Sequence, residues 1–169
     1  MDEDKLNRLP PDVKKQFLKL ALKLSEKKTK SKVHDDFMTF VKHVWPEFIE
    51  GKHHKEIAEK FNQIAKGEIK RLIINMPPRH TKSEFASFLL PSWMVGRKPD
   101  LKIIQTTHTT ELAIRFGRKA KTLMDSAEYK QVFKTRLRED SQAAGKWETE
   151  QGGEYYAAGV GSAITGRGA

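Results

Sequence analysis

The residues of this chain with the clearest chemical potential lie at positions 71–83, in the sequence RLIINMPPRHTKS. Arg79 and Lys82 are cations, and Ser83 supplies a hydroxyl beside Lys82. The apolar run at 72–74 predicts a strand that delivers the loop, and the residues after Ser83 predict a helix. A strand, a short loop and a helix N-terminus with free amides form the layout of a phosphate-binding P-loop. In that layout Lys82 reaches the β and γ phosphate oxygens, and Ser83 binds Mg²⁺.

The loop departs from the standard pattern G-x-x-x-x-G-K-[ST], because Met76 and Thr81 stand at the two glycine positions. Pro77 and Pro78 stiffen the turn that leaves the strand, since proline fixes φ and lacks a donor. Arg79 can hold a phosphate through two parallel hydrogen bonds. The alternative is a basic surface turn between a strand and a helix, because Lys-Ser after a loop is common.

The elements that must position this loop follow from hydrophobic periodicity. Apolar residues after the loop recur at near-helical spacing, and Pro91 ends or kinks that helix. Residues 101–107 predict a second strand, and Thr109 or Thr110 can cap a helix at 111–125. A further strand is predicted at 154–158, within a region rich in glycine. Strands that alternate with helices indicate an α/β fold.

The region upstream of the loop is aromatic and helical in pattern. Residues 34–48 predict one helix, and a second begins after a break at Glu50 and Gly51. Core packing explains most of the aromatic residues, while His53 and His54 can stack on or hydrogen-bond a base. These histidines are poor candidates for a metal site, because no acidic or histidine partner lies four residues further along the helix.

Several segments together resemble one protein family. LIINMPPRHTKSE is similar to the Walker A segment of the large terminase subunits of tailed bacteriophages, the ATPases that pump DNA into capsids. GGEYYAAGVGSAITGRGA is similar to the segment that these proteins carry just before Walker B. The stretches between and upstream of these motifs also fit, so the resemblance covers residues 33–169, preceded by a leader at 1–32. It implies an α/β P-loop NTPase fold of the ASCE, RecA-like type, with a sheet flanked by helices.

The resemblance also implies an activity. ATP and Mg²⁺ are the expected ligands, and hydrolysis would drive double-stranded DNA into a procapsid. The implied catalytic residues are Lys82, Arg79 and Arg167. The implied nucleotide contacts are Pro78, Arg79, His80, Thr81, Lys82, Ser83 and Glu84, with Ser83 on Mg²⁺. The expected partners are DNA, the portal protein, the small terminase subunit and further copies in a ring on the portal. The expected location is the cytoplasm of the infected bacterium, and transiently the procapsid portal.

Members of this family continue with a strand that ends in two acidic residues, then a coupling motif and a nuclease domain. We therefore expect this chain to be the N-terminal part of a longer protein, with an incomplete ATPase domain and little activity of its own. Arg167 lies among glycines shortly before the point where Walker B would follow. The resemblance suits it to act as an arginine finger on ATP in the adjacent subunit. The alternative is a turn arginine that binds local carbonyls.

Two other classes of protein stay open. One is a superfamily-2-like DNA-dependent ATPase or helicase, which shares the order of strand, P-loop and strand but usually has glycine before the P-loop lysine. The other is a non-catalytic basic module that binds DNA or the portal and carries a degenerate P-loop. Downstream sequence would decide the first alternative, and nucleotide binding would decide the second.

Composition adds a basic, cysteine-free character. The net charge is +10 and only 37% of residues are hydrophobic, while the absence of cysteine excludes a disulfide framework. No apolar run suggests a membrane span, and the start is not a signal peptide.

Eight lysines and one acidic residue lie at 14–32, which predicts a basic amphipathic helix for DNA or a partner. The interpretation we favour is that its apolar stripe packs on the domain, with a flexible joint at 27–32. The stripe consists of Val13, Phe17, Leu20, Ala21 and Leu24.

Overall fold

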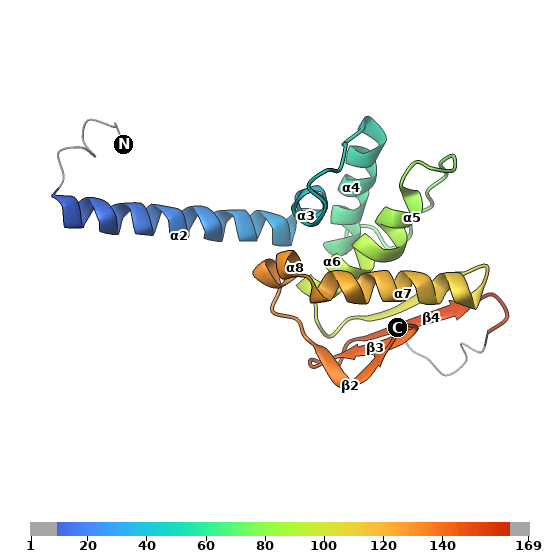
Figure 1. Ribbon diagram of the computed structural model, residues 1–169. Helices are drawn as coiled ribbons and strands as arrows, with labels where there is room; N and C mark the ends of the chain where they lie inside the picture. Colours follow the sequence, from blue (N-terminus) through green and yellow to red (C-terminus); the bar gives the residue numbers. More distant parts are fainter. Residues whose placement is uncertain (1–9, 163–169) are drawn as a thin grey trace.

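The computed structural model describes residues 10–162 and has an α/β architecture (Figure 1). Three helices come first, a helical run follows the candidate loop, and a mixed sheet is built from strands in the second half of the chain. The helices are α2 (Pro11–Asp35), α3 (Phe37–Val44), α4 (Lys52–Ala65), α5 (Lys82–Glu84), the π-helix η1 (Phe85–Leu89), α6 (Leu90–Arg97), α7 (Thr110–Asp125) and α8 (Ala127–Val132). The strands are β1 (Lys102–Thr107), β2 (Leu137–Ala143), β3 (Lys146–Thr149) and β4 (Glu154–Gly159).

The sheet has the strand order β1-β4-β3-β2. β1 and β4 are parallel, with Lys102 opposite Glu154 and Thr107 opposite Gly159, and the other two pairs are antiparallel. These two parallel strands and α7 confirm the elements predicted at 101–107, 154–158 and 111–125. Thr109 is the N-cap of α7, because its Oγ1 accepts a hydrogen bond from the amide of Leu112 at 3.3 Å.

The core joins the helices through aromatic side chains. Phe37 is fully buried, and its ring centroid lies 5.0 to 5.4 Å from those of Phe61, Phe85 and Trp93 in edge-on contacts. Figure 1 shows α7 between the sheet and the other helices. The core therefore fixes the start of the helical run (Lys82–Arg97) against α3 and α4.

The strand predicted at 72–74 is not part of this sheet. Residues 71–77 are extended, and side-chain exposure alternates along them, with Ile73 at 86%. Among the described residues, no strand pairs with this segment, so it forms no ladder. The prediction of a paired strand is wrong for the described part of the chain, because a strand requires a neighbour as well as β-prone residues.

Helix α2 differs from both expectations made for it. Figure 1 shows it projecting away from the body, and Val33 near its end is its one buried residue. Val13, Phe17, Leu20 and Leu24 are 37 to 59% exposed, so the predicted packing of the apolar stripe is wrong. The predicted joint at 27–32 is also wrong, because the helix runs through it; lysine is a good helix former. Along residues 10–162, no helix combines the length and apolarity that crossing a membrane demands.

Candidate phosphate-binding loop

The candidate loop, residues 77–81, connects the extended segment to an uninterrupted helical run from Lys82 to Arg97. Two of its non-glycine residues have left-handed backbones, Arg79 with φ 66° and Thr81 with φ 61°. Such a conformation costs a non-glycine residue about 1–2 kcal/mol, and it is rarest for β-branched residues such as threonine. Thr81 thus adopts the backbone for which the standard pattern uses its second glycine. The sequence therefore lacks the second glycine of the P-loop pattern, but Thr81 keeps the left-handed backbone that glycine favours.

The loop presents donors that nothing in the described chain accepts. The amides of Arg79, Thr81 and Lys82 have no hydrogen-bond acceptor among residues 10–162. Neither Arg79 nor Lys82 has a carboxylate within ion-pair distance in that part of the chain, and the Lys82 Nζ donates to the Met76 carbonyl at 3.3 Å. Arg79 and Ser83 are exposed. Free amides and unpaired cations at one place suit an anion with several oxygens.

His54 of α4 forms a hydrogen bond to this loop. Its ring is buried, at 7% exposure, between Phe48 and Phe85, with centroid distances of 4.8 and 5.2 Å. Its Nδ1 accepts a hydrogen bond from the amide of Gly51 at 2.9 Å, so the proton of the neutral ring lies on Nε2. That Nε2–H donates to Thr81 Oγ1 at 2.9 Å. Burial lowers the pKa of His54 below its ordinary value of 6.5, which favours the neutral ring.

The remaining predicted ligands lie around the same loop. His80 is exposed, and its Nδ1 lies 2.9 Å from the Pro78 carbonyl oxygen. Glu84 faces away from the loop, because both of its carboxylate oxygens accept hydrogen bonds from Lys119 Nζ of α7, at 2.8 and 2.9 Å. The structure therefore brings residues 78–84 together and gives Glu84 a cationic partner. Arg167 lies outside the described residues.

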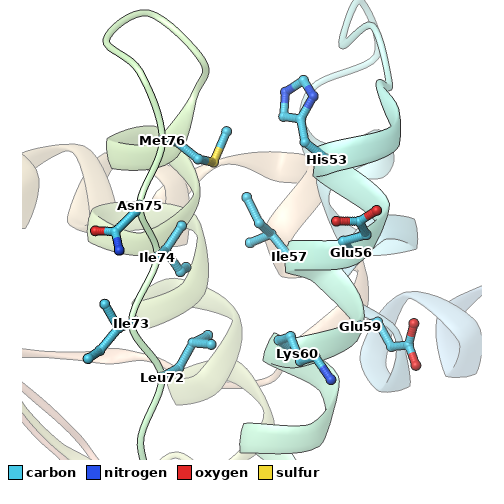
Figure 2. A pocket seen from close by; sticks show the side chains of 10 residues that line it. All are labelled: His53, Glu56, Ile57, Glu59, Lys60, Leu72, Ile73, Ile74, Asn75 and Met76. Carbon is cyan, nitrogen blue, oxygen red and sulfur yellow. The ribbon is translucent and has the colours of Figure 1, made fainter.

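A groove lies below the loop, between α4 and the extended segment (Figure 2). Its volume is about 540 Å³. Figure 2 shows Leu72, Ile74 and Met76 pointing from the extended segment toward Ile57 of α4, with His53 near the loop end. Polar residues Glu56, Glu59 and Lys60 complete the helix side. The groove places an apolar floor next to the candidate loop.

Sequence reasoning misses the roles of two residues that shape the site. The sequence indicates His54 only as a partner for a base, and it does not indicate that Lys119 binds Glu84 beside the loop. Thr81 offers a signal for the first, because a threonine at a position that favours glycine needs support from outside the loop. No pattern in the sequence pairs Glu84 with Lys119, since they are 35 residues apart.

Comparison with protein-family models, with curated proteins and with solved structures finds no match to this chain. Among the described residues, no group of three or more histidine and acidic side chains forms a ready metal site.

Proposed function

We propose that residues 71–84 form the Walker A loop of a P-loop NTPase of the ASCE, RecA-like type. The observation that carries the proposal is the loop itself. It places Arg79 and Lys82 without carboxylate partners beside amides that lack acceptors, within the described chain, at the start of a helical run. The triphosphate of a nucleoside triphosphate is a compact polyanion that these donors can bind. Phosphoryl transfer depends on positioning this group and on stabilising its charge.

In this function each residue of the loop has a task. Lys82 and Arg79 hold the phosphate charge, while the amides of Thr81 and Lys82 bind phosphate oxygens. The exposed hydroxyl of Ser83 is free to bind Mg²⁺, which would neutralise part of the phosphate charge when present. Pro78, His80 and Glu84 flank these contacts, with Glu84 tied to Lys119. Arg167 would stabilise the transition state as a finger in the adjacent subunit.

We further propose that the chain is the ATPase motor part of the large terminase subunit of a tailed bacteriophage. The motor would couple ATP hydrolysis to translocation of double-stranded DNA into the procapsid. It would work as a homo-oligomeric ring on the portal protein, with the small terminase subunit, in the cytoplasm of the infected bacterium. The order of the motifs in residues 33–169 supports this proposal, together with the net charge of +10, which suits a DNA partner.

Nucleotide binding by the wild-type chain and by matched lysine variants tests the proposal. Lys82→Ala removes the loop cation, whereas Lys134→Ala removes an exposed lysine that follows α8, outside the loop. We expect weak Mg-ATP binding, measured by calorimetry, that Lys82→Ala abolishes and Lys134→Ala leaves unchanged. Arg79→Lys should bind less tightly than wild type, because an ammonium cannot bind two oxygens in the planar fork geometry. Equal binding by Lys82→Ala would refute the loop assignment, and DNA binding without nucleotide binding would favour the non-catalytic module.

A further inference from the structure

Thr81 combines a strained backbone with a hydrogen bond to a buried side chain from another element. Its φ of 61° and ψ of 4° place a β-branched residue in the left-handed region. A residue in that region persists when its surroundings over-determine the conformation. The one side-chain contact that reaches the Thr81 hydroxyl within the described chain comes from His54, at 2.9 Å.

His54 is itself firmly placed. Its ring contacts Phe48 and Phe85 in the core, and its Nδ1 closes the start of α4 by accepting from the Gly51 amide. Both ring nitrogens are therefore used, and the Nε2 proton is directed at Thr81. A rigid donor on a core helix can fix a residue on an exposed loop, because the donor does not move with the loop.

We infer that His54 is a positioning residue that holds the phosphate-binding loop in its binding conformation by hydrogen-bonding Thr81. The bond replaces the conformational freedom that glycine supplies at this position in standard P-loops. It keeps the chain turning into the helical run, and so places the amides of Thr81 and Lys82 and the hydroxyl of Ser83. The inference rests on the proposed phosphate-binding role of the loop.

The size of the effect follows from the strain. A left-handed penalty for a non-glycine residue corresponds to about a fivefold to thirtyfold change in the population of this loop conformation. A ligand that binds only the correct conformation loses apparent affinity in proportion to that population. Removal of the His54 bond should therefore weaken Mg-ATP binding by about fivefold to thirtyfold while Thr81 is present.

Two substitutions at position 54 separate the two bonds of the ring. His54→Asn keeps an acceptor near the Gly51 amide but cannot reach Thr81, whereas His54→Gln can reach Thr81 but loses the acceptor for Gly51. Thr81→Gly removes the strain. We expect His54→Asn to weaken Mg-ATP binding as stated, His54→Gln to retain most of the affinity, and His54→Asn in the Thr81→Gly background to change it less than about twofold. An equal loss in both backgrounds, or no loss in the wild-type background, would overturn the inference.

Two further readouts do not depend on nucleotide. The imidazole ¹⁵N spectrum at pH 7 should show His54 as the neutral Nε2–H tautomer, titrating with a pKa below 6.5, since burial and the neighbouring His53 and His80 oppose protonation more than Glu50 favours it. Urea denaturation should show that His54→Asn destabilises the wild-type chain more than it destabilises the Thr81→Gly variant. A charged ring or the Nδ1–H tautomer, or equal destabilisation, would overturn the inference. A wild-type chain that binds no Mg-ATP would refute the proposed function, while these readouts would still decide the role of His54.

Discussion

Gly117 on α7 provides a test in which local and tertiary effects have opposite signs. A Cβ at this position would lie 2.4 Å from the carbonyl oxygen of Ala144 and 2.8 Å from the ring of Tyr155. Helix propensity alone predicts that Gly117→Ala stabilises the chain by about 1 kcal/mol. Overpacking costs typically about 1–3 kcal/mol, and the upper value applies because the nearer atom belongs to the backbone. The net expectation is a loss of about 2 kcal/mol in the free energy of unfolding.

Urea denaturation followed by tryptophan fluorescence measures this loss. With a typical dependence on urea for a small protein, the midpoint should fall by about 1 M. Arg118→Ala, at the exposed neighbouring position, should change the free energy of unfolding by less than about 0.5 kcal/mol. A midpoint that stays constant or rises in Gly117→Ala would refute the packing of the β2–β3 hairpin against α7.

The apolar stripe of α2 and the arginine outside the described residues give two further predictions. Replacement of Phe17, Leu20 and Leu24 by serine should leave the urea midpoint of the body unchanged, because these side chains are exposed; a lower midpoint would restore the packing interpretation. If the proposed function is correct, Arg167→Ala in the assembled protein should spare ATP binding yet reduce hydrolysis by about 10³–10⁵, and mixing with Lys82→Ala subunits should restore part of the activity. Failure of mixed rings to recover would argue that Arg167 acts within its own subunit.

The sequence predicts those helices and strands whose residues show a clear helical or strand pattern together with capping or turn residues at their ends. β1 contains the β-branched pair Ile103 and Ile104, β4 contains Tyr155 and Tyr156, and α7 has both a cap at Thr109 and an amphipathic pattern. The hairpin strand β2 has the sequence LREDSQA, which lacks the alternation of a half-buried strand, so its pairing with β3 could not be predicted. Residues 72–74 are the opposite case, in which the local signal for a strand is present but no paired strand forms within the described part of the chain. These residues favour a strand, but pairing depends on what lies beside them, and that is a tertiary property.

The helical run after the loop shows a similar division between local and tertiary information. The sequence predicts that Pro91 ends or kinks this helix. The run does not end there but continues to Arg97, and the π-helical turn Phe85–Leu89 ends two residues before the proline. The proline lacks an amide donor, and the hydroxyl of the next residue, Ser92, donates to the Phe88 carbonyl at 2.7 Å. Trp93 and Leu89 on the same run are buried, so core packing outweighs the local preference to stop.

The candidate loop could be predicted from sequence because its chemistry lies in consecutive residues, whereas the support for the loop could not. Lys82, Ser83 and Arg79 are found by their types and order alone. Glycine at the position of Thr81 would allow the left-handed backbone conformation without strain. A hydrogen bond from a residue outside the loop can also stabilise that conformation. In this chain the donor is His54, 27 residues earlier and on a different helix. A departure from a glycine pattern therefore carries information of its own. It indicates that a partner outside the loop must hold the backbone, and a buried polar side chain facing the loop is the first place to look for it.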